Sequence, residues 1–288
     1  MPRLVMAIVT FVLALVLGDA RATDLIAQAR AALGGEQKLA KVQGVSCTGT
    51  MQRLIGDRTV EGELTFDLQL PDKMLRTDTI SPMGDRTALV TGQGINGDKL
   101  LRISRILNAP PGAVIRTPPP PAPGSDAEAQ AIRNARAEFA RMTLALLLTS
   151  PPSFPLEYTS AGQAESPDGK ADVIDVRGPN NFAARLFLDA ASHRPLMITY
   201  RGVAPRMVVQ TQRSDAPPSA DPHAAPMPTL PAGDVVEIAM FLDDYKSVDG
   251  MQLPHHITRS IDGKPNEEMT FTVVKINPAF KADTFSGQ

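Results

Sequence analysis

Residues 182–201 read FAARLFLDAASHRPLMITYR, and this stretch predicts a β-hairpin on which the rest of the fold can be built. Side chains alternate along a strand, so residues 182–188 place every second, apolar side chain on one face, and residues 196–200 do the same. The residues between the two runs include Asp, Ser and Pro, which favour turns. Phe187 and Met197 fall on the opposite face. The hairpin is therefore apolar on both sides, which is typical of a sheet that is covered on both faces or curved around an apolar interior.

Strand-like alternation recurs along the chain. Asn96-Gly97 and Asp262-Gly263 predict tight hairpin turns, because Asn, Asp and Gly tolerate the positive φ that such turns need. The segments expected to form strands are 45–54, 60–70, 73–80, 87–91, 99–107, 171–177, 182–188, 196–200, 233–246, 255–261 and 268–276. The pattern indicates about 10–11 antiparallel strands and no alternation of strand and helix.

Two helices are expected in addition. Ser125 and Glu128 form a capping-box pattern at the start of the longer one, and its end, residues 144–148, is apolar all round and so should be buried. A shorter helix should run from Asp24 to the Gly34-Gly35 pair. The fold class is therefore mainly β, with helices packed against an antiparallel sheet.

The N-terminus has the features of an export signal. Arg3 precedes an apolar run at residues 4–18, which is too short for a typical membrane span, and Ala20-Arg21-Ala22 fits the small-x-small cleavage pattern. We expect residues 1–22 to be a signal peptide, cleaved after about Ala22, and the protein to be periplasmic. Residues 23–288 would form a single domain.

Two segments interrupt that domain. Residues 108–123 and 203–232 are rich in proline and are expected to be surface insertions. The formal net charge of −2 argues against a dedicated nucleic-acid surface.

The sequence contains no recognisable catalytic signature. His255 and His256 are adjacent in a predicted strand and so point to opposite faces, which argues against a shared metal ion. Cys47 is the only cysteine, and a buried structural role is expected for it. We therefore expect a protein that is not an enzyme and has no cofactor and no metal site.

Four stretches resemble the outer-membrane lipoprotein-sorting and lipoprotein-carrier (LolA/LolB-like) superfamily. They read ALGGEQKLAKVQGVSCTGTMQ, LQLPDKMLRTD, LDAASHRPLMITYR and VDGMQLPHHITRSIDGKPNEEMTFTVVKINPAF, and the resemblance spans about residues 24–285 without the two insertions. It implies an unclosed antiparallel barrel with the helices as a lid or plug over an apolar cavity. It also implies non-covalent shielding of a lipid or of lipoprotein acyl chains in the periplasm, with membrane-bound donor or acceptor proteins as possible partners. Leu70 stands where the carrier has a basic residue that latches its lid.

Methionine suits a pocket that adapts to varied apolar shapes, although core filling explains the same residues. The residues expected to contact an apolar ligand are Met51, Leu64, Phe66, Met142, Leu146, Leu186, Leu188, Met197, Met240 and Met269. An alternative function is a periplasmic interaction or sensor module of the same fold that binds a partner protein.

Overall fold

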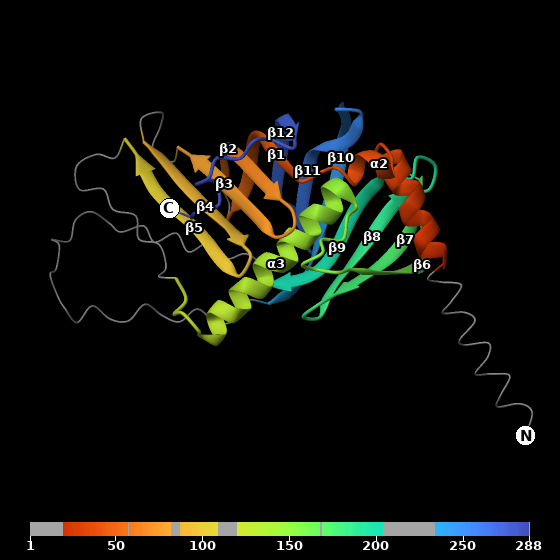
Figure 1. Cartoon of the computed structure of the whole chain (residues 1–288), viewed down its shortest axis with the longest axis horizontal. Helices are drawn as coiled ribbons and strands as arrows, with labels where there is room; N and C mark the ends of the chain where they lie inside the picture. Colours follow the sequence, from red (N-terminus) through yellow and green to blue (C-terminus); the bar gives the residue numbers. More distant parts are fainter. Residues whose placement is uncertain are drawn as a thin grey trace, which may run out of the picture.

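The structure, a computed structural model, describes residues 20–56, 58–81, 87–108, 120–167, 169–203 and 234–287. It contains a helix over residues 20–32, a short helix α2 and a long helix α3 (Figure 1). The labelled helices and strands are α2 (Glu36–Leu39), β1 (Gly44–Ile55), β2 (Arg58–Gln69), β3 (Lys73–Ile80), β4 (Ala88–Asn96), β5 (Lys99–Leu107), α3 (Asp126–Leu147), β6 (Glu157–Ser166), β7 (Gly169–Gly178), β8 (Phe182–Asp189), β9 (Pro195–Val203), β10 (Val235–Val248), β11 (Met251–Ile261) and β12 (Lys264–Ile276).

All of these strands belong to one antiparallel sheet, in the order β5-β4-β3-β2-β1-β12-β11-β10-β9-β8-β7-β6. Every neighbouring pair is consecutive in sequence except β1 and β12, which join the two halves of the sheet. Among the described residues β5 and β6 have no second neighbour, so the sheet is unclosed, as the resemblance implies. The described residues form twelve strands rather than about 10–11, because residues 157–166 form a strand that the sequence pattern did not single out.

Local sequence signals are largely confirmed. The observed bounds of β3 and β5 are those expected, and the Glu128 amide donates to the Ser125 hydroxyl at 3.2 Å, as a capping box requires. One turn is displaced by a residue. Asn96 pairs with Lys99, so the central turn residues are Gly97 and Asp98 rather than Asn96 and Gly97. Gly97 adopts the positive φ of 61° that the turn needs.

The first described helix begins earlier than expected. It spans residues 20–32 rather than starting at Asp24, and Ala22 is fully buried in the core. The predicted cleavage after Ala22 remains a prediction, and residues 1–19 lie outside the described residues. Most of the two proline-rich segments, residues 109–119 and 204–233, also lies outside them.

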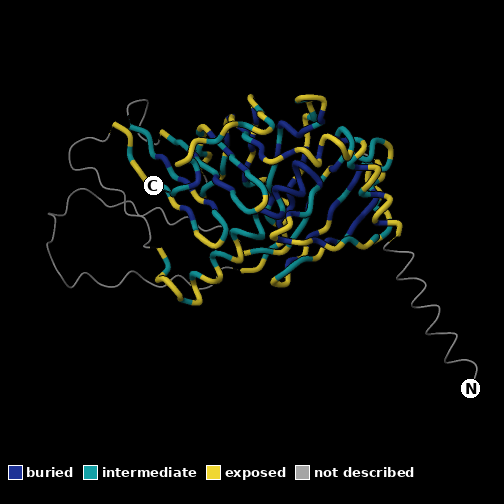
Figure 2. Tube along the Cα trace, in the orientation of Figure 1, coloured by how far each residue is buried: buried dark blue, intermediate teal, exposed yellow. Residues whose placement is uncertain are grey.

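The helix α3 lies across one face of the sheet, called here the inner face (Figure 1). Its second half, from Phe139 to Leu147, is mostly buried, and the buried residues concentrate beneath it (Figure 2). The N-terminal helix supports the end of α3, since Nη1 of Arg30 donates to the Leu148 carbonyl at 2.6 Å and to the Leu147 carbonyl at 3.4 Å. A cation at this position is favourable because the last carbonyls of a helix carry partial negative charge.

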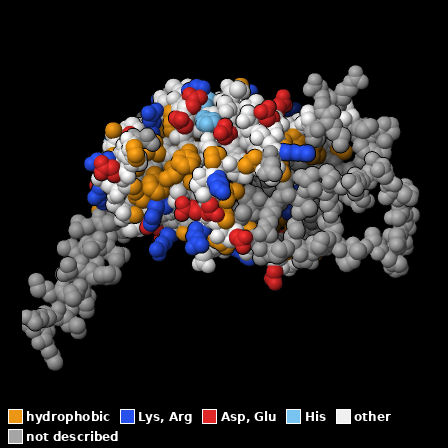
Figure 3. Space-filling view, turned by 180° about the vertical axis from the view of Figure 1, so that it is seen from behind, with side chains coloured by type: hydrophobic (Ala, Val, Ile, Leu, Met, Phe, Trp, Pro, Cys, Tyr) orange, Lys and Arg blue, Asp and Glu red, His pale blue; other side chains and the backbone are white. Residues whose placement is uncertain are grey.

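The opposite, outer face of the sheet carries an apolar row. Val173, Phe187, Met197 and Phe241 are direct neighbours across β7, β8, β9 and β10. Hydrophobic side chains form a band on this back face in the space-filling view (Figure 3). The expectation that the central hairpin is apolar on both faces is therefore confirmed.

Candidate functional site

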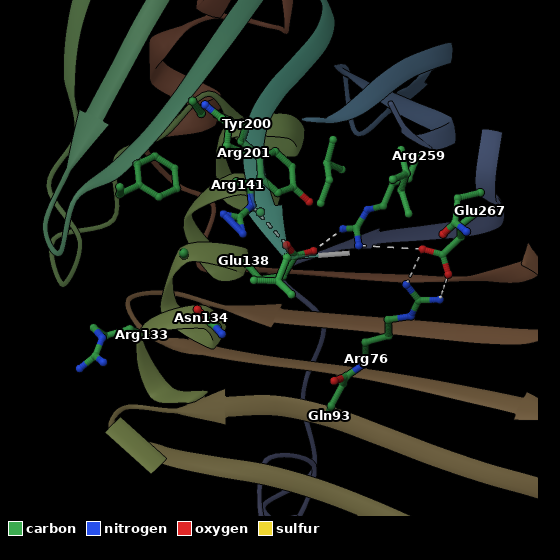
Figure 4. Close-up of a pocket in the computed structure, with 18 of the residues that line it drawn as sticks. Arg76, Gln93, Arg133, Asn134, Glu138, Arg141, Tyr200, Arg201, Arg259 and Glu267 are labelled. Atoms are coloured by element: carbon green, nitrogen blue, oxygen red, sulfur yellow. Dashed lines mark hydrogen bonds and ion pairs between the residues drawn. The ribbon is translucent and has the colours of Figure 1, made fainter. Parts of the chain in front are cut away.

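A large cleft lies between the first half of α3 and the inner face of the sheet. Its volume is about 2300 Å³, and residues from both halves of the sheet line it (Figure 4). Pockets for small molecules usually have volumes of ~300–1,000 Å³, so this cleft has room for a considerably larger ligand.

One wall of the cleft is largely apolar. Tyr200, Ile238 and Ile261 are direct neighbours on β9, β10 and β11, and all three line the cleft. Phe182 and Phe154 extend this wall and pack edge to face, with ring centroids 5.3 Å apart. We call these five residues the apolar wall.

The other wall is polar. Arg76, Gln93 and Arg102 are direct neighbours on β3, β4 and β5, and Arg133 and Asn134 approach from α3 (Figure 4). The cleft is therefore amphipathic, with apolar and cationic surfaces facing the same space.

A network of ion pairs forms the floor between the two walls. Arg76 donates both Nη atoms to the two oxygens of Glu267, at 3.0 and 2.6 Å, and its Nε to Asp78 at 2.8 Å. Arg53 adds hydrogen bonds to the same two carboxylates, at 2.8 Å to Glu267 and 3.0 Å to Asp78. Burial alone would raise the pKa of Glu267, but the guanidiniums of Arg76, Arg259 and Arg53 outweigh this effect and lower the pKa to about 2. Glu267 is thus held as a carboxylate.

The network continues onto α3. Arg259 on β11 forms an ion pair with Glu138, and Nε of Arg141 lies 3.4 Å from the other oxygen of Glu138. Burial would raise the pKa of Glu138, but the positive charges of Arg259 and Arg141 lower it. The Arg141 guanidinium stacks over the Tyr200 ring, 3.9 Å from its centroid. These contacts hold α3 against the inner face.

None of the ten residues expected to contact an apolar ligand lines this cleft. Met197 is half-buried on the outer face. The other nine are buried in a single core cluster: Met51, Leu64, Phe66, Met142, Leu146, Leu186, Leu188, Met240 and Met269. Their contact with a ligand remains a prediction. In the structure they build the core beneath the cleft.

The side chains considered for chemistry, the histidine pair and Cys47, lie in buried or half-buried positions of the sheet. His255 is buried, with Nδ1 3.0 Å from the Leu253 carbonyl oxygen, whereas His256 is half-buried. Cys47 is fully buried, and this burial raises the pKa of its thiol. Among the described residues no group of three or more His, Cys, Asp or Glu side chains lies close enough together to hold a metal ion. None of the helices in the described ranges has the length and hydropathy to cross a bilayer.

Sequence reasoning missed the arginine network, although a signal for it exists. In β11 the alternation places Arg259 on the same face as Ile257 and Ile261, and in β1 it places Arg53 on the same face as Met51. A charged residue that continues an apolar face needs a partner. Such positions on several strands would have indicated a shared buried site.

Comparison with family models and with curated proteins returned no match. Solved structures do match. A LolA superfamily protein from Nitrosomonas europaea is 8% identical, covers 92% of this chain and 96% of its own length, and gives a TM-score of 0.46. A DUF1329 family protein from Desulfovibrio piger is also 8% identical, with coverage of 93% and 97% and a TM-score of 0.48. An outer membrane lipoprotein-sorting protein domain from Vibrio parahaemolyticus is 10% identical, with coverage of 90% and 94% and a TM-score of 0.44.

The expected fold class, an unclosed antiparallel sheet with helices packed against it, is confirmed by the strand order and the helices of the structure.

Proposed function

We propose that this chain is an exported binding protein that shields the acyl chains of a lipid or lipoprotein in the periplasm. The amphipathic cleft carries this proposal. An acyl chain lying along the apolar wall would be removed from water, and each buried methylene contributes about 0.8 kcal/mol. The volume of about 2300 Å³ leaves room for more than one chain. No enzymatic step is part of the proposal.

The proposed location rests on the N-terminal sequence, in which an apolar run follows Arg3 and precedes Ala20-Arg21-Ala22. The intact mass of the protein purified from a periplasm should correspond to a chain that begins at Thr23. Recovery of the full-length mass from the cytoplasm alone would contradict export.

Native mass spectrometry of the protein purified without detergent tests the binding itself. We expect co-purified lipid of discrete mass, or uptake of added phospholipid. A clean mass without uptake would contradict the proposal.

A variant of the apolar wall identifies the site. Ile261 lines the cleft and is half-buried, so Ile261→Glu places a charge beside the proposed chain with little effect on the core. Uptake should fall about tenfold or more, since an unpaired charge against an acyl chain is costly. Val273→Glu is the matched control, because Val273 is an apolar strand residue, 47% exposed, that does not line the cleft. Equal uptake by the two variants would place the lipid elsewhere.

A second candidate function is the binding of a partner protein. It is favoured by β5 and β6, which lie at the two ends of the strand order among the described residues, since an outermost strand can accept an added strand from a partner. Deletion of residues 206–230 separates the two functions. Loss of partner capture with lipid uptake intact would favour the interaction module.

A further inference from the structure

Arg141 lies where the two walls of the cleft meet. Its guanidinium is 3.9 Å from the Tyr200 ring centroid and 5.8 Å from that of Phe182, on the apolar wall. On its other side it reaches Glu138 through Nε. Its side chain is only 15% exposed. A ligand with one apolar and one polar end would place the boundary between those ends at this residue.

The ion-pair network around Arg141 is one negative charge short. Within the described residues it contains four guanidiniums and three carboxylates: Arg53, Arg76, Arg141, Arg259, Asp78, Glu138 and Glu267. Arg53 and Arg76 share two of the carboxylates, whereas Arg141 and Arg259 share Glu138. The surplus positive charge therefore lies on the α3 side.

The hydrogen bonds of Arg259 are incomplete as well. Its Nη1 lies 3.9 Å from Glu267, beyond hydrogen-bonding distance, and its buried Nε finds no partner among the described residues. A buried guanidinium with unused donors is costly, and an added oxyanion would offset that cost.

The described lining of the cleft also carries more positive than negative charge. Its described residues include eight arginines and five carboxylates, and none of these described residues is a lysine. The chain as a whole has a net charge of −2, so positive charge is concentrated in the cleft. Arginine is also the side chain that holds phosphate and carboxylate through two parallel hydrogen bonds.

We propose that the cleft selects amphiphiles whose polar end carries a singly charged oxyanion, namely the phosphodiester of an anionic phospholipid, and that Arg141 binds this group. The inference rests on the proposed lipid-binding function and narrows its ligand class. The phosphodiester lies at Arg141, near Arg259 and the Tyr200 ring, and supplies the missing negative charge. The acyl chains extend from there along Ile238 and Ile261.

The test is isothermal titration calorimetry of the mature protein with two short-chain lipids that share their acyl chains, dihexanoyl phosphatidylglycerol and dihexanoyl phosphatidylcholine. Both lipids carry the phosphodiester, but the choline of phosphatidylcholine adds a positive charge beside the arginines of the cleft, so we expect the anionic lipid to bind at least about tenfold more tightly. Arg141→Gln should abolish most of this preference while leaving the zwitterionic lipid bound. Arg177→Gln is the matched control, since Arg177 is an exposed arginine on β7 that does not line the cleft, and it should keep the preference.

A second variant distinguishes the loss of the lipid contact from a defect in folding. Arg141→Lys keeps the charge but lacks the planar guanidinium. Its preference for the anionic lipid should therefore lie between those of the unsubstituted protein and Arg141→Gln. Thermal unfolding checks that each variant is folded. Equal binding of the two lipids by the unsubstituted protein would overturn this inference and leave the proposed function standing. Binding of neither lipid would overturn both. Inorganic phosphate that binds alone with the same dependence on Arg141, without lipid uptake, would mean that the oxyanion site serves free phosphate and would overturn the headgroup assignment.

Discussion

Arg259 on β11 and Glu138 on α3 form the ion pair that ties the helix to the sheet above the cleft. Both side chains are largely shielded from water, with 19% and 26% of their surface exposed. Removal of Arg259 leaves the Glu138 carboxylate with a largely buried charge that has lost its partner. Arg259→Met should therefore lower the free energy of unfolding by about 3 kcal/mol. The double variant Arg259→Met with Glu138→Met should recover much of that loss. Urea unfolding of the two single variants and the double variant measures the coupling. Strictly additive losses would mean that the pair contributes nothing.

The carboxylate of Glu267 should make stability depend on acidity. Its pKa in the folded protein is about 2, against an ordinary value of 4.5, so between these values the unfolded chain binds more protons. The contribution of Glu267 is thus complete above about pH 4.5 and is lost as the pH falls towards 2, a difference of about 3 kcal/mol. Urea unfolding of the unsubstituted protein at pH 6 and pH 3 should show about 2 kcal/mol of this loss, because pH 3 still lies above the folded-state pKa, and Glu267→Gln should reduce it. The exposed Glu157→Gln is the control and should keep the full pH dependence.

Leu186 provides a test of the core assignment. It is fully buried, and its neighbours Ile174 and Ile198 on β7 and β9 are fully buried as well. Leu186→Ala should lower the free energy of unfolding by about 2–5 kcal/mol through lost burial and the cavity left behind. Because Leu186 does not line the cleft, lipid affinity of the folded fraction should stay within about twofold. A large drop in affinity without a change in stability would show that Leu186 contacts the ligand directly.

Gly49 lies where the pairing of β1 with β12 shifts register. A Cβ atom at this position would overlap the carbonyl oxygen of Thr270 on the neighbouring strand, and that atom belongs to the backbone and has little freedom to move. Gly49→Ala should therefore destabilise the protein by about 2 kcal/mol or more, as overpacking does. Thermal unfolding is sufficient to measure this. An unchanged midpoint would mean that the two strands separate here more easily than the packing indicates.

Cys47 should be inert in the folded protein. It is fully buried and the pKa of its thiol is raised by burial, so little reactive thiolate reaches the solvent. Labelling with a thiol reagent should be at least about a hundredfold slower under native conditions than in urea. Rapid native labelling would mean that β1 opens readily.

Much of the fold could be predicted because the signals are local. The capping box of Ser125 and Glu128 and the bounds of β3 depend on residues a few positions apart. The pairing of β1 with β12 could not be read in this way, since Val45 and Ile276 lie at opposite ends of the sheet-forming chain. The helical residues before Asp24 were missed because Ala22 is buried by tertiary packing that a local pattern does not record.

The cleft itself could not be predicted from the sequence. The methionines were expected to contact a ligand, which remains a prediction, and the structure places Met240 and Met269 in the core. The charges of the ion-pair network come from β1, β3, β11, β12 and α3, and only the folded sheet brings them together. Arg259 and Glu138 are 121 residues apart, so neither spacing nor periodicity links them.

The single long-range pairing in the sheet has a consequence for how the chain folds. Every other strand pair joins strands that are consecutive in sequence, so each half of the sheet can assemble from successive strands. By contrast, β1 and β12 must bring together residues more than 200 positions apart. We expect the pairing of β1 with β12 to be the rate-limiting step of folding. Substitutions that weaken it, such as Val45→Ala, should slow refolding, whereas Leu186→Ala, within one half, should mainly accelerate unfolding. Stopped-flow chevron plots of the two variants compare these rates.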